Sequence, residues 1–415
     1  MEGVRGPIRA ISTGPASGDA ARHLLARRLN AAVAGLEDPA TPMVVVDLDA
    51  FDANAADLVR RAAGKPVRVA SKSLRIPALM ERALAVPGFA GMLSYSLREA
   101  LWLVRQGITD DVVMGYPTVD RGALRDLLGD AEARPCVTLM VDNPAHLSLV
   151  EACGPPHDVR VAIDIDAGLR LGRSHVGPKR SPLHDSSEVV SFAQEVLDRG
   201  FSLVGVMTYE GQVAGVPDDV PNQRARSLVV RKLKSASVAQ LEQRRAEIAR
   251  DLADVVDLEF WNAGGSGSVE TTVSDPVVTE VAAGSGLLVP GLFDHYESFE
   301  PRPAAFFGVQ VVRRPGGGLA TVAGGGFIAS GATGKDRAPI PWAPPDLHLT
   351  GLEGAGEVQT PLTGSGARLL QIGDWVWFRH AKSGELAEHT NLVHLLAGTA
   401  IVETVPSYRG LGLAW

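Results

Sequence analysis

The sequence is poor in cysteine, has no long apolar run and carries no excess of positive charge. Its only two cysteines among 415 residues, Cys136 and Cys153, cannot form the disulfide framework typical of secreted proteins. No stretch of about eighteen apolar residues is present, which excludes a transmembrane helix. The first residues, MEGVRGPIRAISTGPASGDAARHLL, contain no apolar core of a signal peptide. These absences predict a cytoplasmic protein.

The charge balance also excludes classes of partner. The formal net charge is -8 and the sequence pI is about 5.7, so neither nucleic acid nor an anionic membrane surface is an expected partner. Hydrophobic residues make up 45% of the chain and charged residues 21%, which suits a globular protein of two or three domains.

Short apolar runs alternate with longer helical patterns from residue 43 onward, which indicates βαβ units around a parallel sheet. An open doubly wound sheet would be long for one domain, so we expect a (β/α)8 TIM-like barrel over residues 41–297. Nine runs are one more than this barrel needs, and we take the first as a strand leading into it. The runs are 43–48, 67–71, 89–96, 111–116, 136–142, 159–166, 202–209, 258–263 and 277–283.

The composition of the sequence changes after residue 297. Glycine, proline, aromatic residues and short β-type runs dominate residues 298–415, which predicts a compact C-terminal β domain. Residues 1–40 are rich in small residues at their start and helical over 23–36. We expect this N-terminal segment to be partly mobile, and it could join the β domain.

Lys72 is the first candidate site residue. It follows the run VRVAS, the first barrel strand once the leading run is set aside, and active sites of such barrels lie at the C-terminal strand ends. The plain alternative is a solvated lysine at the start of a loop.

Two Gly/Ser-rich loops follow the last two predicted strands, where barrels of this type recurrently bind phosphate. Their glycines allow backbone N–H groups to approach an anion and their serines add hydroxyl donors. The predicted phosphate ligands are Gly265, Ser266, Gly267, Ser268, Gly284, Ser285 and Gly286.

Other strand ends add Arg170 and Tyr209. Arg170 follows the fifth predicted strand and could donate to a cofactor or to a substrate carboxylate; its alternative is a salt bridge to Asp164 or Asp166. Tyr209 follows the sixth and could serve as an acid or base or lie beside a ring; its alternative is a rim aromatic. A lysine facing a phosphate site suits a phosphorylated substrate or a Schiff base with pyridoxal phosphate.

Several motifs together resemble the fold type III enzymes dependent on pyridoxal phosphate, in the branch of D-threonine aldolase and D-serine dehydratase. They are TPMVVVDLDAFDANAADL, VRVASKS, GLRLGR, TYEG, NAGGSGS, GSGLLVPGLFDHY, GGGFIASG and GDWVWFRHAKSGELAEHTN. The resemblance implies bound pyridoxal phosphate, Lys72 as the Schiff-base (aldimine) lysine, and a homodimer with the active site at the interface.

The sequence departs from the metal-dependent members of this branch at His380. Those enzymes usually carry Asp or Cys two residues after a histidine to bind zinc or manganese, but here Lys382 stands at that place, and a cation is no metal ligand. His380 is the metal ligand if any is present, with Glu385, Glu388 and His389 nearby. Otherwise His380 or Lys382 polarises a substrate hydroxyl, or His380 is a satisfied polar residue between strands.

Three functions follow from these residues. The first is a lyase acting on a β-hydroxy D-amino acid substrate, by aldol cleavage or by dehydration and deamination, with Lys72, Tyr209 and His380 as catalytic residues. The second is an amino acid racemase that uses Lys72 and a tyrosine such as Tyr296 as opposed bases. The third is a non-catalytic carrier of pyridoxal phosphate.

Overall fold

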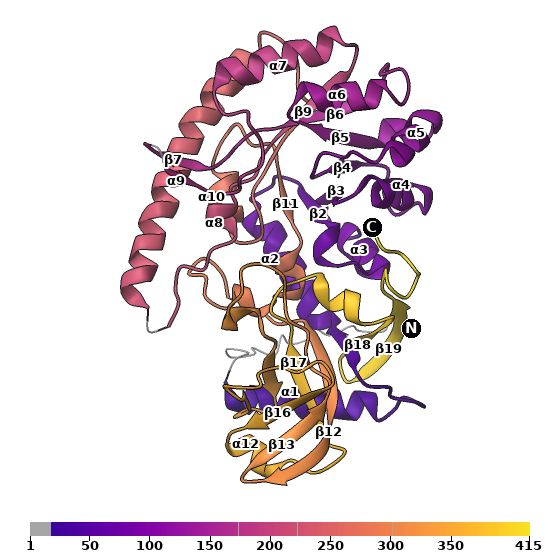
Figure 1. Cartoon of the computed structure of the whole chain (residues 1–415), viewed down its shortest axis with the longest axis vertical. Helices are drawn as coiled ribbons and strands as arrows, with labels where there is room; N and C mark the ends of the chain where they lie inside the picture. The colour runs from indigo at the N-terminus through magenta and orange to yellow at the C-terminus, as the bar shows by residue number, and fades with distance from the viewer. Residues whose placement is uncertain (1–17, 173, 222, 301) are drawn as a thin grey trace, which may run out of the picture.

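The computed structural model describes residues 18–172, 174–221, 223–300 and 302–415. Two parts are stacked one above the other in Figure 1: a barrel ringed by helices, and below it a domain built mainly of strands. Of the predicted N-terminal segment, residues 1–17 lie outside the described residues. No described helix is both long enough and apolar enough to span a membrane.

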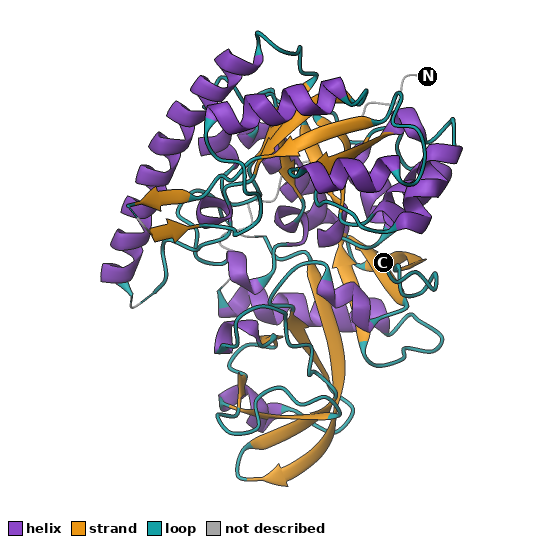
Figure 2. Ribbon diagram, turned by 45° about the horizontal axis from the view of Figure 1, so that its top comes forward, coloured by secondary structure: helices purple, strands orange, loops and turns teal. Residues whose placement is uncertain are grey.

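The upper part is a closed barrel of parallel strands, as predicted, in the order β10-β11-β2-β3-β4-β5-β6-β9. Its strands correspond to the last eight predicted runs. They are β2 (Val67–Ala70), β3 (Phe89–Ser94), β4 (Val112–Met114), β5 (Val137–Val141), β6 (Arg160–Asp164), β9 (Ser202–Thr208), β10 (Phe260–Ala263) and β11 (Glu280–Ala283). Most of their residues are buried, because side chains fill the barrel inside and helices cover it outside (Figure 2).

Helices connect the strands and ring the barrel. They are α2 (Leu48–Arg61), α3 (Pro77–Leu84), α4 (Leu97–Arg105), α5 (Arg121–Gly129), α6 (Pro144–Glu151), α7 (Ser186–Asp198), α8 (Gly211–Ala214), α9 (Arg224–Leu252), α10 (Val269–Val273) and α11 (Ser285–Leu288). Between β6 and α7 the chain inserts a hairpin of β7 (Leu169–Leu171) and β8 (Ser174–Val176), which packs on the long helix α9.

The lower part is a mixed sheet that includes β1 (Met43–Asp47). This strand pairs with β12 and β18 of the C-terminal region, so it belongs to the second sheet. The predicted barrel range 41–297 had included it. The other strands are β12 (Ala305–Gly316), β13 (Leu319–Ala323), β14 (Ile340–Ala343), β15 (His348–Leu349), β16 (Gln359–Thr363), β17 (Trp375–Arg379), β18 (Leu392–Ala397) and β19 (Ala400–Pro406).

Helix α1 (Asp19–Val33) also lies with this second sheet, where it contacts β14, β17 and β19. Its buried face is Ala26, Leu29, Ala32 and Val33, and Trp377 of β17 donates its indole N–H to Asn30 at 2.8 Å. A short helix, α12 (Ser365–Leu369), and the 3₁₀ turns η1 (Ser71–Ser73), η2 (Arg134–Cys136), η3 (Gly291–Phe293), η4 (Lys335–Arg337) and η5 (Glu385–His389) complete the described structure.

The packing of the barrel interior requires a glycine at one position, where it faces an aromatic ring. A Cβ placed on Gly205 of β9 would lie 2.2 Å from the ring of Phe260 on β10, and the Arg68 guanidinium lies 5.6 Å from the centre of the same ring. Arg68 is itself held by Glu280 of β11 at 2.8 Å. The ring therefore occupies the space that a side chain at residue 205 would need, and fixed neighbours prevent it from moving away.

We expect Gly205→Ala to lower the free energy of unfolding by roughly 2 kcal/mol, because an added methyl group must displace Phe260 in a closed interior. Chemical denaturation measures the change. Gly129→Ala is the matched control, since nothing lies within 4 Å of the added Cβ and the site ends helix α5. A loss for Gly205→Ala no larger than that of the control would contradict this account of the interior.

Candidate active site

Lys72 lies in the turn η1, directly after β2, at the C-terminal end of the barrel strands. Its Nζ donates a hydrogen bond to the phenolic oxygen of Tyr116 at 2.6 Å. Tyr116 follows β4, so two different strand ends converge on this contact. The lysine therefore faces a partner inside the barrel mouth and is not a solvated charge at a strand end.

Small residues around Lys72 permit a close approach of the opposite loop. A Cβ on Gly284 would lie 2.6 Å from the carbonyl oxygen of Ala70 and 2.8 Å from Cβ of Ser73. The hydroxyl oxygens of Ser73 and Ser285 are 3.2 Å apart. Only glycine fits at residue 284, and the lysine turn is thereby packed directly against the loop after β11.

A cavity of about 590 Å³ opens at this end of the barrel. Barrel residues form one wall and residues of the C-terminal region form the other. The barrel contributes, among others, Lys72, Tyr116, Arg180, Tyr209, Asn262 and Ser266, and the C-terminal region contributes Ser330, Gly331, Arg337, Lys382, Ser383 and Glu385.

Positive charge surrounds the phenol of Tyr116. Burial acts to raise the pKa of Tyr116, but the charge and hydrogen bond of Lys72, together with Arg180, outweigh burial and hold it below the usual 10. The Arg180 guanidinium lies 5.3 Å from the ring centre of Tyr116 and 5.1 Å from that of Tyr209. Tyr116 is therefore a stronger acid than an ordinary tyrosine.

Five of the predicted site residues, besides Lys72, line the same cavity. They are Tyr209, Gly265, Ser266, Gly284 and Ser285. Burial raises the pKa of Tyr209, so its phenol stays protonated near neutral pH. Gly267, Ser268 and Gly286 do not line this cavity but shape the loops behind it.

The hydroxyl of Ser266 joins the two loops. It accepts hydrogen bonds from the backbone N–H groups of Gly284 at 3.3 Å and Gly286 at 2.9 Å. From outside the barrel, buried Arg61 donates to the Ser266 carbonyl at 2.8 Å and also binds Glu270. The two loops consequently form one rigid unit.

A buried ion-pair network fixes the start of the first loop. Glu210 accepts the backbone N–H of Gly264 at 3.1 Å and pairs with Arg245 at 3.1 Å. Arg245 also pairs with Asp275 at 3.3 Å, and all three charged side chains are at least 97% buried, with exposed fractions of 3%, 3% and 2%. Removing one partner would leave a buried charge, so the network strongly specifies this loop.

Arg170 is not brought to this site. It lies on the hairpin strand β7, where its side chain is 45% exposed and pairs with Asp166 at 3.3 Å. Its backbone exchanges hydrogen bonds with Gln240 of α9. The hairpin carries the arginine away from the barrel mouth, and the salt bridge considered as its alternative is the interaction observed.

His380 lies behind the cavity wall and does not line it. The side chain is buried, with its Nε2 3.4 Å from the hydroxyl of Ser383, which does line the cavity. Burial, reinforced by the charge of Arg379, lowers the pKa of His380 to about 3, so the ring is neutral at pH 7. His380 therefore does not reach the cavity, and Ser383 is the cavity residue that it contacts.

The donor set around His380 does not fit a divalent metal. The nearby candidates have other partners: Glu385 accepts from the Ser330 N–H, Glu388 pairs with Arg75, and His389 stacks on Phe327. Lys382 adds a positive charge at the cavity wall. Within residues 18–415, less the three undescribed positions, no three His, Cys, Asp or Glu side chains gather as metal ligands.

Tyr116 and Arg180 are site residues that the sequence reasoning missed. Tyr116 ends the predicted run 111–116, so its position at a strand end was a usable signal. Arg180 comes from the segment after the β7–β8 hairpin, whose path the sequence pattern does not reveal.

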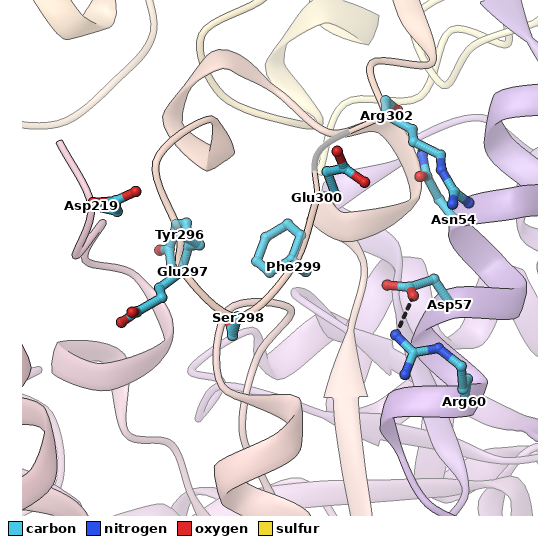
Figure 3. Close-up of a pocket in the computed structure, with 10 residues that line it drawn as sticks. All are labelled: Asn54, Asp57, Arg60, Asp219, Tyr296, Glu297, Ser298, Phe299, Glu300 and Arg302. Carbon is cyan, nitrogen blue, oxygen red and sulfur yellow. Dashed lines mark hydrogen bonds and ion pairs between the residues drawn. The ribbon is translucent and has the colours of Figure 1, made fainter. Parts of the chain in front are cut away.

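A second cavity of about 660 Å³ lies beside helix α2, residues 296–300 and Arg302 (Figure 3). In its lining Asp57 pairs with Arg60 at 2.6 Å, and Asn54 donates to the carbonyl of Leu287. It holds no lysine, and Tyr296 is the one residue it shares with the first cavity. The chemistry therefore centres on the cavity of Lys72.

The fold and the site together define the class: a TIM-like barrel with a strand-end lysine and two joined Gly/Ser-rich loops in its mouth. The family model described as alanine racemase, N-terminal domain, matches residues 46–288. This match covers more than half of the chain, which therefore belongs to that family; the family implies pyridoxal phosphate.

Individual relatives are similar over different lengths. A D-threonine aldolase of Arthrobacter sp. is 28% identical over 258 residues, which span 60% of this chain and 62% of the aldolase. The crystal structure of D-threonine aldolase from Filomicrobium marinum has a TM-score of 0.73 at 21% identity, covering 90% of this chain and 96% of that one. D-threo-3-hydroxyaspartate dehydratase from Delftia sp. HT23 has a TM-score of 0.72 at 20% identity, covering 92% and 100%.

The C-terminal tail anchors the turn that carries Lys72. Tyr408 donates its backbone N–H to the carbonyl of Arg75 at 2.9 Å and its hydroxyl to Glu99 at 2.8 Å. Arg75 in turn donates to the carbonyl of Lys72 at 3.2 Å. Burial raises the pKa of Glu99 to about 7, although hydrogen bonds from Tyr95, Ser71 and Tyr408 oppose the rise.

The sign of the pH effect follows from this pKa. Because the folded-state pKa of Glu99 exceeds its ordinary value of 4.5, the folded chain holds more protons than the unfolded chain between these two values. The stability contribution of Glu99 therefore falls as pH rises from about 4.5 to about 7, and the Tyr408 hydrogen bond limits that fall.

We expect Tyr408→Phe to lower the free energy of unfolding by about 2 kcal/mol at pH 8 and by less at pH 5.5, since a hydrogen bond to an ionised carboxylate is the stronger one. Urea unfolding at both pH values measures this difference. Tyr296→Phe is the control, because its hydroxyl donates to the Ala214 carbonyl, which does not titrate. Equal losses for Tyr408→Phe at both pH values would contradict the assignment.

Proposed function

We propose that the chain is a lyase dependent on pyridoxal phosphate that acts on a β-hydroxy D-amino acid. It either cleaves the Cα–Cβ bond, as an aldolase, or removes the β-hydroxyl and ammonia, as a dehydratase. The observation that carries this proposal is Lys72 at the end of β2, facing two joined Gly/Ser-rich loops across one cavity. Family membership and the likeness to D-threonine aldolase support it.

The residues of the cavity fit pyridoxal phosphate. Lys72 would hold its aldehyde end, and Gly265, Ser266, Gly284 and Ser285 would hold its phosphate. When bound, the cofactor supplies an aldehyde that condenses with amines and a ring that accepts the electrons released at Cα.

Tyr116 and Lys72 form the proton-handling pair of the proposed mechanism. The phenol has a lowered pKa and lies 2.6 Å from the lysine Nζ, so it can take a proton from that atom and return it. A lysine Nζ freed of its proton acts as the base toward Cα–H. Tyr209, whose pKa is raised, remains a hydrogen-bond donor in the same wall.

Ser383 is the proposed contact for the substrate β-hydroxyl. It lines the cavity, and its own hydroxyl lies 3.4 Å from Nε2 of His380. His380 is neutral at pH 7 and so can accept or donate one hydrogen bond to Ser383 without a charge in the wall. We assign His380 the role of a positioning residue.

The racemase alternative requires a second base opposite Lys72, and the tyrosine considered for it is poorly suited. Tyr296, the tyrosine considered for that role, donates its hydroxyl to the Ala214 carbonyl at 2.9 Å, and burial raises the pKa of its phenol. A carrier without turnover stays distinguishable by assay. The homodimer and the cytoplasmic location remain proposals that rest on the family resemblance and on the low cysteine content.

We expect Lys72→Ala to abolish the visible absorbance that borohydride bleaches in the wild-type holo-protein, since the cofactor then has no lysine to bind. Absorption spectra before and after reduction measure this. Lys232→Ala, on the exposed side of helix α9, is the matched control and keeps the wild-type spectrum. A Lys72→Ala variant with an unchanged reducible absorbance would overturn the role of Lys72.

We expect the holo-protein to consume at least one of D-threonine, D-allothreonine and D-serine. Aldol cleavage of threonine yields glycine and acetaldehyde, whereas dehydration yields a keto acid and ammonia, so product analysis separates the two reactions. Exchange of the Cα hydrogen for solvent deuterium without breakdown would favour the racemase. Saturated cofactor binding without turnover of any neutral or acidic β-hydroxy D-amino acid would favour the carrier.

A further inference from the structure

The cavity of Lys72 has a charge opposite to that of the whole chain. The chain carries a formal net charge of -8, yet the cavity wall contains five cationic side chains and one carboxylate. The cations are Lys72, Arg75, Arg180, Arg337 and Lys382, and the carboxylate is Glu385. A concave site lined by one sign of charge concentrates ligands of the other sign.

Not all of these cations are available to a ligand. Arg75 pairs with Glu388 at 2.6 Å, and Lys72 is committed to Tyr116. Glu385 also lines the cavity, where it accepts hydrogen bonds from the backbone N–H of Ser330, the nearer at 3.0 Å, and offsets one of the positive charges. Three cations, Arg180, Arg337 and Lys382, therefore remain to face the cavity.

Arg180 is held in place without being neutralised. Its guanidinium lies over the rings of Tyr116 and Tyr209, at 5.3 Å and 5.1 Å, and no carboxylate of the described residues lies within 4.0 Å of it. Stacking fixes the guanidinium plane but leaves its N–H edges for a planar anion. One such anion is the α-carboxylate that every amino acid substrate carries.

Lys382 and Arg337 form a second cationic group on the opposite, C-terminal wall. Lys382 Nζ donates to the hydroxyl of Ser330 at 2.8 Å, a neutral partner. The nearest acidic group to Arg337 is exposed Asp336, at 3.7 Å, which solvent screens. The α-carboxylate needs one cationic group, and the cofactor phosphate would lie at the Gly/Ser-rich loops. This second group would therefore have no anionic partner in a substrate with an uncharged side chain.

We propose that the substrate carries a second carboxylate on its side chain, which Lys382 and Arg337 bind. This inference rests on the proposed function and names its substrate class: an acidic β-hydroxy D-amino acid, such as a D-3-hydroxyaspartate, rather than threonine or serine. Charge-assisted hydrogen bonds to two cations account for a preference of about tenfold or more over a neutral side chain.

Turnover gives the first test. We expect kcat/KM of the holo-protein to be at least about tenfold higher for a D-3-hydroxyaspartate than for D-threonine, and this ratio to fall several-fold in Lys382→Gln and in Arg337→Gln. Lys335→Gln, in the same segment but outside the cavity wall, is the control and keeps the ratio. Turnover of D-threonine with no preference for the acidic substrate would overturn the inference and leave the proposed function intact.

Binding to the wild-type holo-protein gives a second test that requires no turnover and no folded variant. Calorimetric titration with succinate and with propionate compares a dicarboxylate with a monocarboxylate of similar length. We expect succinate to bind at least about tenfold more tightly and the difference to shrink at high salt. Equal affinities would overturn the inference whether or not any substrate is consumed, whereas no turnover of either substrate class with the cofactor bound would overturn the proposed function.

Discussion

The closure of the parallel barrel is the constraint on which the site depends. Because every strand runs in the same direction, the C-terminal ends of β2, β4 and β9 meet in one mouth, together with those of β10 and β11. Lys72, Tyr116 and Tyr209 lie far apart in the sequence and become neighbours only through this closure. Inside the barrel, Phe260 occupies the space that a side chain at residue 205 would need.

Residues outside the barrel complete the cavity at the mouth of the barrel. The C-terminal region contributes Ser330, Arg337, Lys382, Ser383 and Glu385 to the cavity. The tail residue Tyr408 holds the turn of Lys72 through Arg75 and Glu99. Strand β1 ties the two parts together, since it precedes the barrel in sequence but pairs with β12 and β18. The geometry of the cavity consequently depends on how the second sheet packs against the barrel.

Much of this arrangement could be predicted from the sequence. Continuous apolar runs located all eight barrel strands, and their ends located Lys72, Tyr209 and the loops at residues 265 and 284. Strand β1 was assigned to the barrel range because a buried run reveals its burial but not its partners, which here lie about 260 and 350 residues further along. Long-range pairing of this kind has no local signal.

The site residues that the sequence analysis placed wrongly or missed are all positioned by the path of a loop. Arg170 lies on the first strand of the β7–β8 hairpin and Arg180 follows the hairpin, and the sequence pattern does not reveal which of them reaches the mouth. His380 directly follows β17, but Ser383 lines the cavity in its place, and the sequence has no signal for this difference.

The central claim is that Lys72 is the amine to which the cofactor attaches. Borohydride reduction of the holo-protein, followed by proteolysis and mass spectrometry of the peptides, tests it most directly. The account predicts a pyridoxyl group on the peptide that contains Lys72 and on no other. A label on a different lysine, or no label on a protein shown to hold the cofactor, would contradict it.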